Sequence, residues 1–413
     1  MSKQGTIDEP TSAVTAGSVK PVSVLLICDS YPPIVGGSEI EAQRVASAMI
    51  RRGHRVQILC AGGPPMPAVR EWIDPAGVPV RILTRHSHGR AKDFTFAAEV
   101  AWAIWTGRRA YDVVYFLMQG LHLAAGLPVA RYAGKPIVMK VGGSGVIPLM
   151  RRSRAGKFEL DKLKTWASRL LVLNEGMVQE AVADGFARSM ITWMPNPVDI
   201  DEFRPAQPGE AASWRAAHGI PVDAHVAIYV GRFSQEKGLP GLLRGFARAV
   251  EKDRSAVLVL VGDGNQRSEL EALAGELNLG PGNLRFTGRV DVKEVPLWLR
   301  SSDVFALTSP SEGFSCALLE AMSAGLASVV SDIPANRQLV DPGVHGLAVP
   351  FDNEAAIGEA FLQLFREESL RQRMANSARQ RVVENFSTIR VVERYERLFE
   401  EVLHTSRSSF DSH

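Results

Sequence analysis

The chain has 413 residues, of which 46% are hydrophobic and 22% charged, a composition typical of a soluble globular protein long enough for two domains. Its 47 basic and 45 acidic side chains nearly cancel, so charge gives no case for nucleic acid as a partner. The three cysteines are far apart and have no metal-ligand spacing, and no apolar run approaches the ~20 residues of a membrane span. A disulfide framework and a spanning helix are therefore not expected.

The first 20 residues are rich in Ser, Thr and Gly and lack the apolar core of a signal peptide. A disordered tail is predicted over residues 1–20. Without a disulfide framework or a signal peptide, the cytoplasm is the predicted location.

The first predicted strand is a nearly continuous apolar run from Val22 to Cys28, as expected for a strand buried on both faces. A loop containing Gly36 and Gly37 follows it. A helix is predicted from Ser38 to Arg52, with Ser38 and Glu41 forming a capping box. The two glycines would then present backbone amides at a helix N-terminus, where a phosphate can bind; a plain tight turn is the alternative.

Strands and helices continue to alternate through the first half of the chain. The predicted strands are Arg55–Cys60, Val80–Leu83, Asp112–Leu117, Pro136–Val141 and Leu170–Leu173, and the predicted helices are Phe96–Thr106 and Met177–Asp184. Such alternation is typical of a parallel sheet, in which ligands bind beyond the carboxyl ends of the strands.

Residues 149–166 combine basic and large apolar side chains. The basic ones are Arg151, Arg152, Arg154, Lys157, Lys162 and Lys164, and the apolar ones are Leu149, Met150, Phe158, Leu160, Leu163 and Trp166. Two interpretations stay open: a peripheral contact with a membrane surface, or a solvated helix face on which the lysine stems pack.

A proline-rich segment separates the two halves of the chain. Pro195, Pro197 and Pro205 cannot continue a helix or a central strand, so residues 196–208 are predicted to form a linker. One domain is predicted over residues 21–195 and a second over residues 209–386, followed by an amphipathic helix over residues 387–404.

The second half restarts the alternation. The predicted strands are Val226–Val230, Ala256–Val261 and Leu284–Gly288, and the predicted helices include Gln266–Leu277, Glu294–Arg300, Ala355–Phe365 and Leu370–Phe386. Arg232 and Lys237 lie in the loop after the first of these strands, where two cations can neutralise a diphosphate. For Lys237 alone, a solvated loop lysine is the alternative.

A strand over Val304–Leu307, a loop, a helix and a second strand over Ala327–Val330 are predicted next. Glu312 and Gly313 lie in the loop, and the helix begins near Phe314 or Ser315 and ends at Ala324. Backbone amides at Phe314, Ser315 and Cys316 would form an anion site.

Glu320 lies inside this helix, over a stripe formed by Cys316, Ala317 and Ala324. A carboxylate on such a stripe needs a hydrogen-bond donor, which the hydroxyls of a ribose could supply. The alternative is a surface glutamate at Glu320 and a plain loop charge at Glu312.

Four segments together resemble retaining glycosyltransferases of family 4. Glu312 and Glu320, with seven residues between them in SEGFSCALLEAMSAG, resemble the paired-glutamate motif of that family. GRFSQEKG at residues 231–238 is similar to its donor-phosphate loop, and YPPIVGGSE at residues 31–39 to its first glycine loop. MPNPVD at residues 194–199 resembles its interdomain segment, with Pro197 in place of glycine. The resemblance covers about residues 22–404.

This resemblance implies a GT-B fold: an α/β protein with two doubly wound, Rossmann-like domains that face a cleft, with the last helix packing back on the first domain. It implies transfer of a sugar from a UDP- or GDP-sugar to an acceptor that the sequence does not identify, with retention of the anomeric configuration. Glycan, glycolipid or glycosylated-metabolite biosynthesis is the implied setting, in the cytoplasm or peripherally at the inner face of the membrane.

The resemblance also assigns roles to individual residues. Arg232 and Lys237 would hold the leaving diphosphate, Glu312 the hydroxyls of the donor sugar, and Glu320 the ribose. The remaining donor-binding residues would be Gly36, Gly37, Val290, Gly313, Phe314 and Ser315. No metal and no cofactor are implied, because cationic side chains take the charge-neutralising role.

The chain departs from the family pattern at one strand. Where family members commonly carry two histidines after an aspartate, this chain has Tyr115 and Leu117. Gln119 and His122 follow, and for His122 a helix-start or surface histidine is the favoured interpretation. The departure keeps open the alternative of a nucleotide-sugar-binding relative without transfer activity. A sugar-nucleotide epimerase of the same fold is a second alternative.

Overall fold

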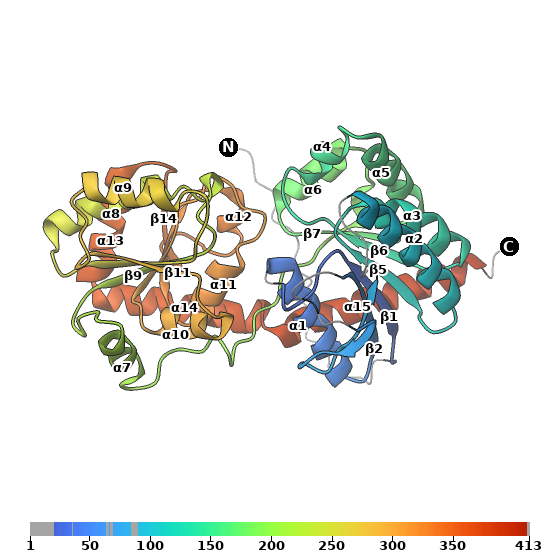
Figure 1. The fold of residues 1–413 in the computed structure, drawn as a ribbon, viewed down its shortest axis with the longest axis horizontal. Coiled ribbons are helices and arrows are strands. Elements are labelled where there is room, and N and C mark those ends of the chain that lie inside the picture. Colours follow the sequence, from blue (N-terminus) through green and yellow to red (C-terminus); the bar gives the residue numbers. More distant parts are fainter. Residues whose placement is uncertain (1–19, 35, 63–65, 67–68, 84–89, 411–413) are drawn as a thin grey trace. The chain divides into compact units, whose positions relative to one another are not determined.

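The computed structural model describes residues 20–34, 36–62, 66, 69–83 and 90–410 (Figure 1). The disordered tail predicted for residues 1–20 lies outside the described residues except for Lys20. The chain divides into two compact units: Met1–Pro195 with Val391–His413, and Asn196–Arg390. Residues 196–208, predicted as a linker, thus belong to the second unit.

The first unit is built on an eight-stranded sheet with the order β3-β4-β2-β1-β5-β6-β7-β8. All neighbouring strands run parallel except β3 and β4. The strands are β1 (Ser23–Cys28), β2 (Arg55–Ala61), β3 (Glu71–Ile73), β4 (Pro79–Leu83), β5 (Val113–Leu117), β6 (Ile137–Lys140), β7 (Arg169–Val172) and β8 (Ile191–Trp193). The helices are α1 (Gly37–Arg51), α2 (Arg90–Gly107), α3 (Leu121–Tyr132), α4 (Val146–Met150), α5 (Arg154–Trp166), α6 (Glu175–Ala183) and the 3-10 turn η1 (Arg188–Met190).

The second unit has a six-stranded parallel sheet with the order β11-β10-β9-β12-β13-β14. Its strands are β9 (Val226–Val230), β10 (Val257–Val261), β11 (Leu284–Gly288), β12 (Val304–Leu307), β13 (Ala327–Ser331) and β14 (Gly346–Val349). Its helices are α7 (Glu210–Ala217), α8 (Leu239–Lys252), α9 (Arg267–Glu276), α10 (Val295–Arg300), α11 (Cys316–Ser323), α12 (Pro334–Arg337), α13 (Glu354–Arg366) and α14 (Glu368–Asn385), with 3-10 turns η2 (Gln235–Lys237) and η3 (Val292–Glu294). The final helix, α15 (Thr388–Phe410), passes from this unit into the first.

The central strands are apolar because helices cover both faces of each sheet. Every residue of β1, β5, β10 and β13 is buried. Since successive side chains of a strand point to opposite faces, full burial requires cover on both sides. The doubly wound α/β architecture expected from the sequence is confirmed. The sequence analysis did not identify β3, β8 and β14, which are short strands at sheet edges.

The predicted capping box at the start of α1 is wrong. Gly36 is the N-cap, and the Ser38 hydroxyl donates to Glu39 Oε2 at 3.0 Å instead of capping the helix. Glu41 is buried, and its carboxylate accepts from Lys140 Nζ and from the Tyr395 hydroxyl. Because a charged amine stands beside it in the core, Glu41 faces inward and cannot reach back to the helix start.

Helix α15 is anchored in the first unit by a buried carboxylate. Glu396, whose side chain is 4% exposed, accepts from Arg52 Nε at 2.6 Å and from Arg52 Nη2 at 2.8 Å. His54 Nε2 lies 2.9 Å from Glu396 Oε1, while His54 Nδ1 accepts from the Val22 amide at 3.1 Å. These contacts place the His54 proton on Nε2 and tie α15 to the end of α1 and the start of β2.

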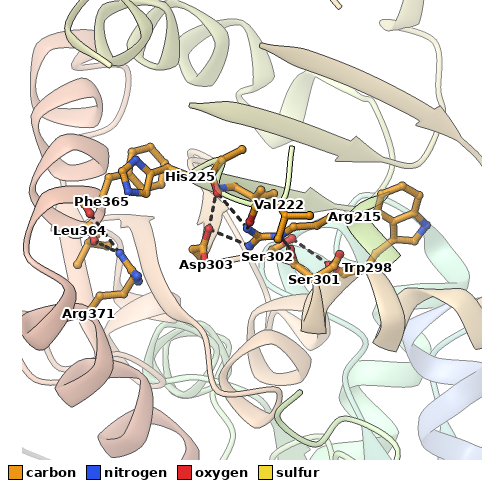
Figure 2. A network of polar contacts seen from close by, with 12 residues as sticks. Arg215, Val222, His225, Trp298, Ser301, Ser302, Asp303, Leu364, Phe365 and Arg371 are labelled. Atoms are coloured by element: carbon orange, nitrogen blue, oxygen red, sulfur yellow. Dashed lines mark hydrogen bonds and ion pairs between the residues drawn. The ribbon is translucent and has the colours of Figure 1, made fainter. Parts of the chain in front are cut away.

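A second polar anchor joins α7 to the sheet of the second unit (Figure 2). Arg215, which is 7% exposed, donates to the carbonyls of Ser301, Val222 and Ala224 and to Asp303 Oδ2 at 3.0 Å. Asp303 also accepts from the Val226 amide at 2.7 Å. The network therefore fixes the amino ends of β9 and β12, two neighbouring strands whose carboxyl ends carry the predicted site.

Replacing Glu396 with Gln should destabilise the first unit by about 2–4 kcal/mol at pH 7, because Arg52 loses its buried anionic partner. Hydrogen bonds from Arg52 and His54 hold the pKa of Glu396 below 4.5 against the opposing effect of burial. A lowered carboxyl pKa gives stability that is present above the unfolded value and lost as the pH falls through the folded value. The difference between wild type and variant should therefore shrink below pH 4.5. Urea unfolding followed by circular dichroism measures both effects.

Glu400→Gln is the matched control, because Glu400 lies on the same helix and is exposed. An equal loss of stability in the two variants would contradict the proposed anchoring by Glu396.

Candidate active site

The loop after β9 carries Arg232 and Lys237. Arg232 is exposed, and its carbonyl accepts from the Tyr229 hydroxyl at 3.0 Å. Burial raises the pKa of Tyr229, and the neighbouring carboxylates of Glu312 and Glu236 raise it further, so this hydroxyl stays a donor. Lys237 ends the 3-10 turn η2, and its side chain is 25% exposed. Both cations thus remain partly accessible to a ligand.

The loop after β10, which contains Gly262 and Gly264, packs against the backbone around Arg232. The Gly231 amide donates to the Val261 carbonyl, and the Phe233 amide donates to the Asp263 carbonyl, both at 3.0 Å. A Cβ added to Gly262 would collide with the Gly231 carbonyl, and one added to Gly264 would collide with the Phe233 backbone. The close packing of the two loops therefore requires glycine at positions 262 and 264.

The loop after β12 brings Glu312 to Lys237. Lys237 Nζ lies 2.8 Å from Glu312 Oε1, and the Glu312 side chain is only 8% exposed. Gly238 has φ +65°, and a Cβ added there would collide with the Thr308 carbonyl. The two loops, from neighbouring strands β9 and β12, are therefore joined by both an ion pair and a close backbone contact.

A chain of buried hydrogen bonds continues from Glu312 into the protein. The Ser309 hydroxyl donates to Glu312 Oε1 at 2.8 Å, and the Ser331 hydroxyl donates to the Ser309 carbonyl. Asn336 Nδ2 donates to the Ser331 carbonyl at 2.9 Å and to its hydroxyl at 3.1 Å. Ser309, Ser331 and Asn336 are each at most 1% exposed. These hydrogen bonds connect the end of β12, the end of β13 and α12 to the Glu312 carboxylate.

Helix α11 begins directly after these residues. Ser315 is its N-cap, and the Ser315 hydroxyl accepts from the Leu318 amide at 3.2 Å, so the cap is filled by the chain itself. Glu320 lies half-buried on this helix. Asn196 Nδ2 donates to Cys316 Sγ at 3.3 Å, which places part of the linker segment against the small-residue stripe.

The remaining predicted donor-binding residues of the second unit lie at the same sheet edge. Gly313 follows Glu312 and is half-buried, and Phe314 packs its ring 6.1 Å from that of Phe386. Val290 is half-buried and follows β11, two strands away from β9. Since all strands of this sheet are parallel, the loops after β9, β11 and β12 leave it at one edge.

Gly36 and Gly37 belong to the first unit, at the start of α1. A Cβ added to Gly36 would collide with the Glu39 carboxylate, which accepts a hydrogen bond from the Ser30 hydroxyl. Glu39 lies in the first turn of the helix, where its charge is favoured by the helix dipole. A phosphate at these amides would have to displace this carboxylate.

The two residues at the family's histidine positions are part of the core. Tyr115 and Leu117 are each 2% exposed, and the Tyr115 hydroxyl lies 2.9 Å from the Tyr395 hydroxyl of α15. His122 is the second residue of α3, as the helix-start interpretation expected. It is not a surface histidine, however: it is 2% exposed, and its Nδ1 lies 3.0 Å from Asp29 Oδ1. Burial against Phe96 and Phe116 explains the difference.

Sequence reasoning missed Ser309, Ser331, Asn336 and the tight contact of Gly238. Small hydroxyl residues directly at strand ends are a weak signal for such a chain, because a serine at that position is equally common in plain turns. Within the described ranges, no group of three His, Cys, Asp or Glu side chains could hold a metal ion. Of the helices that the structure describes, none is both long and apolar enough to cross a membrane.

Two family models match the chain in succession. The model "Glycosyltransferase Family 4" matches residues 35–202, and "Glycosyl transferases group 1" matches residues 210–381.

Curated relatives cover most of the chain. A phosphatidyl-myo-inositol mannosyltransferase of Mycobacterium tuberculosis is 27% identical over 366 residues, covering 84% of this chain and 89% of the relative. A 2-deoxystreptamine glucosyltransferase of Streptomyces kanamyceticus is 28% identical over 309 residues, covering 70% of this chain and 79% of the relative.

Solved structures share the fold over nearly the whole chain. Anabaena Alr3699/HepE in complex with UDP and glucose has a TM-score of 0.76 at 18% identity, covering 92% of this chain and 100% of that chain. Sucrose-phosphate synthase of Thermosynechococcus elongatus also has a TM-score of 0.76, at 20% identity, covering 93% of this chain and 100% of that chain. With both family models matched in order, the chain belongs to glycosyltransferase family 4, the retaining transferases of GT-B fold that use nucleotide-sugar donors.

Proposed function

We propose that this glycosyltransferase transfers a hexose from a UDP- or GDP-sugar, and that the loops after β9 and β12 bind the diphosphate and the sugar of the donor. The observation that carries the proposal is the joined pair of loops, with Lys237 Nζ 2.8 Å from Glu312 Oε1 and Arg232 exposed beside them. Relatives named for mannosyl and glucosyl transfer support a hexose, and the UDP-glucose complex of Alr3699/HepE supports UDP.

Negative charge develops on the leaving diphosphate as the glycosidic bond breaks. Arg232 can contact two phosphate oxygens through its planar guanidinium, and Lys237 can add a point charge. Both would be held in place before the reaction, so they stabilise the transition state without a large reorganisation. A metal ion is not needed for neutralisation in this proposal, because these two cations provide it.

Glu312 and Glu320 would bind the hydroxyls of the donor. The Glu312 carboxylate, oriented by Lys237 and Ser309, would accept from hydroxyls of the sugar. Glu320 would accept from the ribose. Val290, Gly313, Phe314 and Ser315 would contribute backbone around the nucleotide, and Gly36 and Gly37 would contribute amides from the first unit.

A binding protein without transfer activity and an epimerase remain the competing functions. Tyr115 motivates the first of these, because it stands at a family histidine position and its hydroxyl lies 2.9 Å from the Tyr395 hydroxyl in the core. Turnover on nucleotide sugars separates the transferase from the binding protein, and release of an epimerised sugar nucleotide identifies the epimerase.

The proposal also covers the acceptor and a contact of the protein with a membrane surface. The named relatives act on an inositol lipid and on an aminocyclitol, so we propose an acceptor with a polyol ring.

Peripheral membrane contact through residues 149–166 is supported by the exposed Leu149 and Phe158 and by three exposed basic side chains, Arg152, Arg154 and Lys157. Arg151 and Lys164 contribute less, because both pair with Asp184.

Arg232→Ala and Lys237→Ala should each lower turnover on the donor by about 10²-fold or more, as loss of one preorganised charge does. The double variant should fall short of the product of the two effects, because both cations act on one leaving group. Initial rates with a panel of nucleotide sugars provide the measurement. Lys252→Ala, which removes a half-exposed cation at the far end of α8, is the control. Near-normal turnover in both single variants would remove Arg232 and Lys237 from the site of transfer.

Ser309→Ala should lower turnover by about tenfold while the protein keeps its stability to within about 1 kcal/mol, because Glu312 loses one orienting hydrogen bond. Ser328→Ala is a matched control: Ser328 is also fully buried, and its hydroxyl has no hydrogen-bond partner among the described residues. Steady-state kinetics and urea unfolding of both variants test the difference. Equal rates for the two would show that Ser309 does not position Glu312.

Leu149→Glu with Phe158→Glu should reduce co-sedimentation with vesicles containing anionic lipid by about fivefold, because both apolar side chains lie exposed beside basic ones. Val222→Glu, a charge added at an exposed apolar residue of the second unit, is the control. Unchanged sedimentation of the double variant would leave the solvated helix face as the interpretation of this segment.

A further inference from the structure

The first unit contains a cavity of about 320 Å³, and none of its lining residues belongs to the proposed donor site. It lies where β1, β2 and β5 end, three adjacent strands of the parallel part of the sheet, and is closed on one side by α2. Its lining residues are Asp29, Ala61, Asp93, Phe96, Gly120, Leu121 and His122. The carboxyl edge of a parallel sheet is where α/β proteins bind ligands, and this volume falls at the lower end of known ligand pockets, about 300–1,000 Å³. The space suits a single ring.

One wall of the cavity contains a His–Asp pair. His122 is buried, its Nδ1 lies 3.0 Å from Asp29 Oδ1, and its Nε2 has no hydrogen-bond partner among the described residues. The backbone that presents it is unusual: Met118 has φ +99° and Gly120 has φ +150°. A Cβ added to Gly120 would lie 3.0 Å from His122 Nδ1. Residues held in such conformations concentrate at ligand sites, where the surrounding structure maintains them.

The cavity is acidic. The Asp29 side chain is 52% exposed, and Asp93 is exposed on the opposite wall formed by α2. No Lys or Arg lies among the described residues that line the cavity, and the ion pair that Asp29 makes there is with His122. Phe96, Ala61 and Leu121 complete the wall with apolar surface. This arrangement disfavours anions and favours a ring that carries a positive charge.

We propose that this cavity binds the acceptor and that the acceptor is an amine-bearing polyol, an aminocyclitol or amino sugar. Its ammonium group contacts Asp29 and Asp93, its hydroxyls reach the carboxylates, and an apolar ring face packs on Phe96. His122 is a positioning residue, since it fixes the Asp29 carboxylate from one side. That the bound ring is the acceptor rests on the proposed transferase function; that the cavity binds such a ring does not.

Calorimetric titration of the full chain with 2-deoxystreptamine, a diamino cyclitol, and with myo-inositol, a neutral cyclitol, tests the proposal. The diamine should bind at least about tenfold more tightly. Asp29→Asn and Asp93→Asn should each weaken the diamine about tenfold and change myo-inositol by less than about twofold. Salt should weaken only the diamine. Glu71→Gln, which removes a carboxylate of the same unit outside the cavity lining, should change neither affinity.

Several results would overturn the proposal: equal affinity for the two rings, an affinity for the diamine that survives both substitutions, or no binding of either ring. Asp93→Asn keeps the test valid if Asp29→Asn perturbs folding, because Asp93 is exposed and does not contact His122 in the described contacts. Titration of the same samples with UDP and with GDP separates the two proposals. Binding of UDP without the diamine would overturn the cavity alone, whereas binding of the diamine without any nucleotide would overturn the transferase donor site.

Discussion

The ion pair between Lys237 and Glu312 is the interaction on which the site of the second unit depends. It joins two loops that are 75 residues apart in sequence but leave neighbouring strands β9 and β12. Opposite charges placed this close attract each other strongly. The close contact of Gly238 with the Thr308 carbonyl also fixes the distance between the two loop backbones. The cation proposed for the diphosphate and the carboxylate proposed for the sugar are therefore held next to each other.

Small polar residues support this pair from the interior. Ser309, Ser331 and Asn336 are buried and bonded to one another, so the carboxylate of Glu312 is held from behind as well as by Lys237. Buried polar groups are costly unless they are paired, and here the pairing links β12, β13 and α12 at the edge where the donor would bind. The opposite end of the same sheet is fixed by Arg215 and Asp303, so both ends of β9 and β12 are constrained (Figure 2).

The first unit uses its polar residues differently. Tyr115, which stands at a family histidine position, bonds to Tyr395, and Glu396 on the same helix bonds to Arg52 and His54. A position that commonly serves catalysis in the family thus serves the packing of α15 in this chain. Burial raises the pKa of Tyr115, which keeps its hydroxyl neutral in the core. The histidine that does reach a cavity, His122, comes from the following helix and is aligned by Asp29.

The sequence by itself determined the doubly wound architecture, the strands β9, β11 and β12 to the residue, and the segments that carry the motifs, because apolar runs and glycine-ended helices are local signals. It also placed Arg232, Lys237 and Glu312 at strand ends. It failed at Ser38 and Glu41, where a locally plausible cap was overridden by the buried amine of Lys140. His122 lies at a helix start, which the sequence favoured, but it is buried rather than on the surface. Only the tertiary structure decided that Lys237 meets Glu312, that Ser309 is tied to Asn336 through Ser331, and that Tyr115 faces α15. These contacts join residues from different loops and strands, and their partners are set by strand order and packing, which no local pattern encodes.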